Sequence, residues 1–123
     1  MLKISGLINV RMGSSRLPGK ALMDVQGKPM LGRLVERMMM ANSINEVVIA
    51  TSTQPENNII EKFCADEGLK CYRGSEDDVL DRMCGACGAF DLDVCVEVFG
   101  DGPLIDDLSR TKLTQKIFEA FFI

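Results

Sequence analysis

Short apolar runs alternate along this chain with segments whose apolar residues recur at helical spacing. The runs have the length of buried strands, and the other segments have the pattern of amphipathic helices. Strands that alternate with helices in this way form a parallel sheet covered on both faces. The pattern therefore predicts an α/β, Rossmann-like, mainly parallel sheet with helices on both faces. The expected strands are 4–10, 47–50, 70–73 and 93–99, with a short extended piece at 21–25, and the expected helices are 30–41, 57–67, 79–90 and 108–121.

Residues that begin or end helices lie at the boundaries of these segments. Pro29 suits the first position of the first helix. Gly68 is a C-terminal stop for the second helix. Ser75 or Asp77 is the expected N-cap of the third helix, and Asp106 that of the last.

Charge is distributed unevenly, and this changes the picture of the first loop. Four of the 14 basic residues and none of the 18 acidic residues precede Asp24. Three of those cations fall in a single segment after the first strand, which we call the cationic loop (residues 11–20). Its glycines and serines let backbone N–H groups and hydroxyls approach an anion closely. Phosphate fits best. The loop reads Arg11-Met12-Gly13-Ser14-Ser15-Arg16-Leu17-Pro18-Gly19-Lys20.

Composition excludes several classes of function. A chain of 123 residues forms one domain at most. Its net charge of −4 argues against general binding to nucleic acid or anionic membranes. No apolar run has the length of a membrane span, and the N-terminus lacks a signal-peptide pattern. We therefore expect a cytoplasmic protein.

The five cysteines are expected to be free thiols. Cys84 and Cys87 have the spacing of a metal or redox pair. However, no second such pair and no histidine are present, so a zinc site would lack ligands. The pair also lies in a helical pattern, where cysteine commonly acts as a small buried apolar residue. Without histidine, catalysis should depend on the placement of charges rather than on proton shuttling.

In a parallel sheet, ligands bind at the carboxyl ends of the strands. If the fourth strand lies beside the first, Asp101 faces the cationic loop. Asp101 is then either an ion-pair partner of the loop or a ligand of a divalent cation on a polyphosphate. Mg²⁺ is bound in this manner, by one or two carboxylates together with phosphate oxygens.

Three motifs follow one another along the chain. They are the cationic loop, Arg73-Gly74-Ser75-Glu76-Asp77-Asp78-Val79-Leu80-Asp81-Arg82 and Gly100-Asp101-Gly102-Pro103-Leu104-Ile105-Asp106. Together they resemble the sugar-acid cytidylyltransferases. This family includes the acylneuraminate and 3-deoxy-manno-octulosonate cytidylyltransferases, and the nearest branch is that of the SpsF-like spore coat polysaccharide biosynthesis proteins. The resemblance implies a nucleotide-diphospho-sugar transferase fold, similar to the catalytic half of GT-A glycosyltransferases, and transfer of CMP from CTP to a sugar acid.

The resemblance also implies a role for individual residues. Arg11 and Lys20 would stabilise charge on the phosphates during the reaction. Asp101 would bind Mg²⁺, and Ser52 and Arg73 would lie near the nucleoside. The residues expected to hold the CTP triphosphate are Arg11, Met12, Gly13, Ser14, Arg16 and Lys20.

The family's proteins are longer than this chain, so the resemblance implies that residues 1–123 are the N-terminal, nucleotide-binding part of a cytidylyltransferase domain. The absent C-terminal half would supply the sugar contacts. We expect the partners to be CTP, a nonulosonic or octulosonic acid and further copies of the chain, as a homo-oligomer. Two alternatives remain: a remnant that binds nucleotide without turnover, and another nucleotidyltransferase of this fold that uses GTP or UTP.

Overall fold

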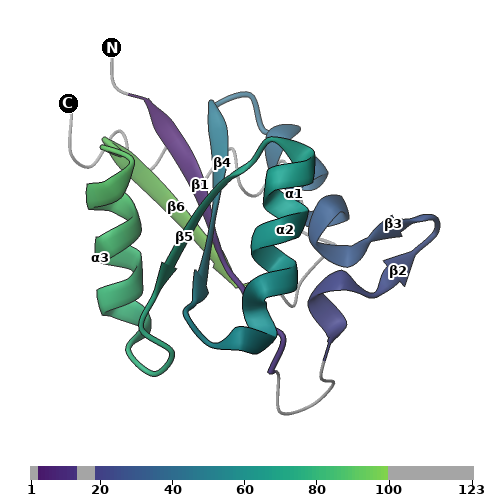
Figure 1. Ribbon diagram of the computed structural model, residues 1–123. Helices are drawn as coiled ribbons and strands as arrows, with labels where there is room; N and C mark the ends of the chain where they lie inside the picture. The colour runs from purple at the N-terminus through teal and green to yellow at the C-terminus, as the bar shows by residue number, and fades with distance from the viewer. Residues whose placement is uncertain (1–2, 14–18, 100–123) are drawn as a thin grey trace.

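The computed structural model describes residues 3–13 and 19–99 as a parallel sheet with helices on both faces (Figure 1). Neighbouring strands of this four-stranded sheet are all parallel. The spatial order of the strands is β5 (Lys70–Gly74), β4 (Glu46–Ser52), β1 (Ile4–Asn9) and β6 (Val94–Phe99). The connections contain three α-helices: α1 (Met30–Met39), α2 (Asn58–Glu67) and α3 (Val79–Ala89). The predicted fold class is therefore confirmed.

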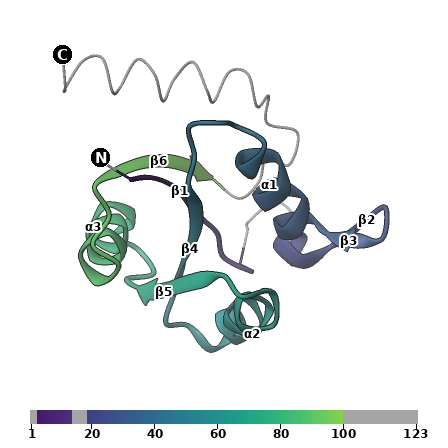
Figure 2. The ribbon, with the colours of Figure 1, turned by 90° about the horizontal axis from the view of Figure 1, so that it is seen from above.

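The two faces of the sheet carry separate apolar cores. Side chains alternate between the faces along a strand, so Ile8 of β1 packs with α1 and α2, whereas Leu7 packs against α3. Figure 2 shows α1 and α2 on one side of the sheet and α3 on the other. Leu34 and Ile60 are completely buried under the first pair of helices.

Strand β1 lies between β4 and β6, so the fourth predicted strand does lie beside the first. Its register pairs Asn9 with Ala50 on one side and with Phe99 on the other. The carboxyl ends of all these strands therefore reach the same edge of the sheet. We call this the carboxyl edge.

The extended piece predicted at 21–25 is wrong in its first half. Lys20–Leu22 form a 3-10 turn, η1, and only Asp24–Val25 form a strand, β2, which pairs with β3 (Lys28–Pro29). The turn forms because Gly19 adopts a left-handed backbone with φ of 79°. This turn buries Ala21 against the core. The β2–β3 arm projects from the α1 side of the molecule in Figure 1.

Two further helix boundaries test the sequence analysis. Gly68 ends α2 in the left-handed conformation, as predicted. The N-cap of α3 is Asp78 rather than Ser75 or Asp77. Its carboxylate accepts a hydrogen bond from the Asp81 N–H at 2.9 Å. Ser75 instead accepts one from the Asp78 N–H at 3.0 Å, which shapes the loop before the helix.

The predicted helix 108–121 and its cap Asp106 lie outside the described residues. Within those residues, no helix combines the length and the apolar character needed to cross a lipid bilayer.

Candidate functional site

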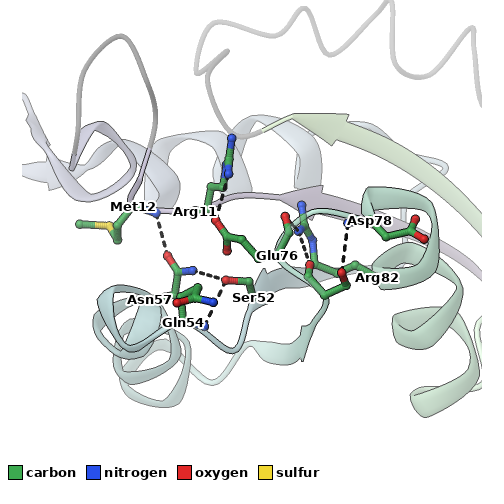
Figure 3. A network of polar contacts seen from close by, with 9 residues as sticks. Arg11, Met12, Ser52, Gln54, Asn57, Glu76, Asp78 and Arg82 are labelled. Atoms are coloured by element: carbon green, nitrogen blue, oxygen red, sulfur yellow. Dashed lines mark hydrogen bonds and ion pairs between the residues drawn. The ribbon is translucent and has the colours of Figure 1, made fainter.

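Polar side chains from several segments collect at the carboxyl edge (Figure 3). Arg11 follows β1, Ser52 ends β4, and Glu76 lies in the loop between β5 and α3. This edge is where open parallel sheets bind their ligands. The sheet thus positions the start of the cationic loop in the region that the sequence predicts.

The cationic loop leaves the sheet immediately after Val10, whose N–H still donates to the Ala50 carbonyl at 3.0 Å. Arg11 then turns outward, and its side chain is 46% exposed. The Met12 carbonyl accepts a hydrogen bond from the Gly19 N–H at 2.9 Å, so both described ends of the loop are joined. Lys20 follows at the start of η1 and is half-buried.

Asn57, from the turn η2 (Pro55–Asn57), connects the cationic loop to β4. Its Oδ1 accepts a hydrogen bond from the Met12 N–H at 2.8 Å. Its Nδ2 donates to Ser52 Oγ at 2.6 Å. Both residues are completely buried, and Ser52 Oγ also accepts from the Gln54 N–H at 3.3 Å. The Ser52 hydroxyl is thus used within the protein.

Glu76 is the ion-pair partner of Arg11, and the two side chains point toward one another in Figure 3. Arg11 Nη1 and Glu76 Oε1 lie 2.9 Å apart. The pKa of Glu76 is lowered, first by the Ser52 hydroxyl and then by Arg11, against the opposing effect of burial. Glu76 Oε2 is buried without a hydrogen bond of good geometry among the described residues.

A buried arginine, Arg82 of α3, holds the loop that carries Glu76. Only 3% of Arg82 is exposed. Its Nη1 donates to the carbonyls of Ser75 at 2.7 Å and Glu76 at 3.3 Å, and its Nε donates to Asn9 Oδ1 at 3.3 Å. Asn9 Nδ2 in turn donates to Glu97 Oε1 at 2.9 Å. Burial lowers the pKa of Arg82. These bonds tie α3, β1 and β6 together beneath the site.

Arg73 holds the loop after β4 through hydrogen bonds to its carbonyl groups. Its Nε donates to the Ser52 carbonyl at 2.9 Å, and its Nη2 donates to the Gln54 carbonyl at 2.8 Å. A third contact reaches Asn58 Oδ1 on α2 at 2.8 Å. The side chain is 16% exposed. Arg73 therefore shapes the segment where the sequence places nucleoside recognition, and its contact with a nucleoside stays a prediction.

The sequence-predicted residues thus divide into two groups. Arg11, Met12 and Gly13 lie together at the carboxyl edge, next to the Ser52 segment. Ser14, Arg16 and Asp101 lie outside the described residues. Sequence reasoning missed three residues that organise the site. Glu76 and Arg82 belong to the second motif, which was a usable signal, whereas Asn57 lies in no motif. The three are Asn57, Glu76 and Arg82.

The cysteines do not form a metal site. All five are free thiols, as expected. Cys84 is exposed on α3, however, so the expectation that it is a small buried residue is wrong. Burial raises the pKa of Cys95 to about 12, which disfavours the thiolate that binds metals. The described residues contain no group of three or more potential metal ligands.

Comparison with known proteins shows which family the chain resembles. A family model described as cytidylyltransferase matches residues 5–122. The spore coat polysaccharide biosynthesis protein SpsF of Bacillus subtilis is 36% identical over 117 residues, which cover 92% of this chain and 49% of that protein. The chain spans only 41–49% of the length of SpsF and two other curated relatives.

Two solved structures agree with the sequence match. A cytidylyltransferase from Leptospira borgpetersenii serovar Hardjo-bovis superposes with a TM-score of 0.87 at 30% identity, covering 99% of this chain and 51% of that one. A CMP:2-keto-3-deoxy-manno-octonic acid synthetase complexed with CTP gives 0.77 at 30% identity, covering 95% and 48%. Since the family model and the solved structures agree, the chain belongs to the cytidylyltransferase family.

Proposed function

We propose that this chain binds CTP at its carboxyl edge and forms the nucleotide-binding part of an enzyme that transfers CMP to a sugar acid. The observation that carries the proposal is the placement of Arg11 to Gly13. They emerge from β1, between the two neighbouring strands, in a chain whose relatives include a synthetase complexed with CTP. An arginine at this edge can contact phosphate oxygens through several of its five donors.

These residues contribute to catalysis by electrostatic stabilisation of the phosphates. A hydroxyl oxygen of the sugar acid forms a bond to the α-phosphorus of CTP, the α–β phosphoanhydride bond breaks, and pyrophosphate leaves. The proton of that hydroxyl passes to solvent water. Negative charge develops on the departing phosphates. Arg11 and Lys20 stabilise that charge, which is the form of catalysis open to a chain without histidine. Arg16 and Ser14 add donors from the same loop.

Mg²⁺ belongs to the proposal as well. Asp101 follows β6 in the sequence, and β6 lies directly beside β1. A single carboxylate with phosphate oxygens is a donor set that suits this ion. When bound, Mg²⁺ neutralises phosphate charge, and Asp101 is the residue that would hold it.

Calorimetric titration of CTP with Mg²⁺ tests the proposal. Charge-assisted hydrogen bonds contribute about 1.5–3 kcal/mol, so Lys20→Ala should weaken CTP binding about tenfold or more. Lys62→Ala is the matched control, because Lys62 is an exposed lysine of α2. Equal affinity in wild type and Lys20→Ala would contradict phosphate binding at this loop.

A further inference from the structure

We propose that Asn57 and Glu76 are positioning residues that hold Arg11 and Met12 in the conformation that receives a phosphate chain. The inference rests on the proposed function, because it concerns anion binding at the same loop. Neither residue needs to touch the nucleotide. Each acts through a residue of the cationic loop.

The first positioning residue is Asn57. It is completely buried, and both ends of its amide are used inside the protein. One end accepts the Met12 N–H at 2.8 Å, and the other donates to Ser52 Oγ at 2.6 Å. Since the amide bridges the main chain of Met12 and the side chain of Ser52, it links the cationic loop to the end of β4.

The second positioning residue is Glu76. Its Oε1 contacts Arg11 Nη1 at 2.9 Å, and its side chain is 21% exposed. The Ser52 hydroxyl, which accepts a hydrogen bond from Asn57, also lowers the pKa of this carboxyl group. Two adjacent residues of the cationic loop are therefore each held by a side chain from another segment, Met12 by Asn57 and Arg11 by Glu76.

A different role for Glu76 would make the opposite prediction. If Glu76 were only a counter-ion that competes with the ligand for Arg11, removing its charge would strengthen anion binding. If it positions Arg11, removing the charge weakens binding, although the site becomes less negative. The sign of the change separates the two roles.

Glu56 provides the matched control. A Cβ atom placed on Gly13 would lie 2.6 Å from Glu56 Oε1, so this carboxylate also flanks the loop. Glu56 is exposed and takes no part in the contact of Asn57 with Met12 or of Glu76 with Arg11. Glu56→Gln thus removes a nearby negative charge and leaves the positioning contacts intact.

The first experiment is calorimetric titration of inorganic tripolyphosphate into the full chain and both variants. Glu76→Gln should bind about three- to tenfold more weakly than wild type, as expected for one weakened charged contact. Glu56→Gln should bind as tightly as wild type or more tightly. Unchanged or tighter binding by Glu76→Gln would overturn the inference.

The second experiment needs no ligand. Hydrogen exchange of the Met12 amide, followed by NMR, should accelerate at least about tenfold in Asn57→Ala, because its acceptor is lost. Asn57→Asp retains an acceptor oxygen and should preserve the protection. Equal exchange in wild type and Asn57→Ala would overturn the inference. If Asn57→Ala does not fold, the protection in Asn57→Asp and the titration of Glu76→Gln decide it.

The two experiments distinguish failure of the proposed function from failure of the positioning role. If wild type binds no tripolyphosphate while Met12 is protected as described, the proposed function fails and takes the inference with it. If wild type binds but Glu76→Gln is unaffected, only the positioning role fails.

Discussion

At the scale of single residues, the arginines of the site differ in burial and in their hydrogen-bond partners. Arg82 is buried and donates hydrogen bonds to the Ser75 and Glu76 carbonyls and to Asn9. Arg11 is 46% exposed and has one side turned to Glu76. A buried polar group needs internal partners, whereas an exposed guanidinium keeps donors for a ligand. The surroundings, rather than the residue type, therefore distinguish the structural arginine, Arg82, from Arg11, which we propose binds phosphate.

Glu76 should also couple stability to pH. Because its pKa is lowered in the folded protein, its contribution to stability is present above its ordinary pKa of 4.5 and is lost as the pH falls through the folded-state value. The free energy of unfolding of wild type should therefore exceed that of Glu76→Gln at pH 7, and the difference should shrink below about pH 4.5.

Urea unfolding of both proteins between pH 7 and pH 3 measures this difference. Glu56→Gln serves as the control, since it removes an exposed carboxylate that takes no part in the contact between Arg11 and Glu76. A constant difference between wild type and Glu76→Gln over the whole range would show that the lowered pKa is not coupled to folding.

At the scale of secondary structure, the spacing of apolar residues was sufficient to predict the four strands of the main sheet and the three helices, because each element's buried face follows from its own local sequence. Local sequence was not sufficient to predict the N-cap of α3. Ser75, Asp77 and Asp78 are all good N-caps, and the deciding fact is that Asp78 keeps an extended backbone with φ of −97° and ψ of 92°. Only part of the candidate site could be predicted from the sequence, for a similar reason. Arg11 follows a strand, but Asn57 and Arg82 meet partners 45 and 73 positions away.

The cap of α3 can be tested with neighbouring aspartates. Asp78→Ala removes the acceptor of the Asp81 N–H and should lower the free energy of unfolding by about 1 kcal/mol. Asp77→Ala should change it by less than about 0.5 kcal/mol, because Asp77 is an exposed loop residue. Chemical denaturation of the two variants in parallel measures both values, and a larger loss in Asp77→Ala would place the cap where the sequence analysis did.

At the scale of the whole molecule, the chain is matched to 41–49% of the length of its first curated relatives. The described part supplies the sheet, its carboxyl edge and the start of the cationic loop. Sugar recognition is expected from the remainder of the family's longer proteins. The homo-oligomer and the division into an N-terminal part stay predictions.

We therefore expect a 123-residue polypeptide of this sequence to bind CTP but to release pyrophosphate from CTP and a sugar acid very slowly. Loss of substrate positioning can raise a barrier by as much as about 7–11 kcal/mol, which reduces an ordinary enzyme to background. A coupled pyrophosphate assay with several nonulosonic and octulosonic acids measures the rate. Rapid turnover with any of them would show that this polypeptide contains a complete acceptor site.

The central claim is that CTP binds at the carboxyl edge, and amide NMR during a titration with CTP and Mg²⁺ tests it most directly. Chemical-shift changes should concentrate at the ends of the cationic loop (11–13 and 19–20), after β4 (52–54) and after β5 (74–76). The cavity between α1 and α2, of about 190 Å³ and lined by Gly32, Phe63 and Leu69, is an internal control where shifts should stay unchanged. Saturable changes confined to that cavity, or none at the carboxyl edge, would contradict the account.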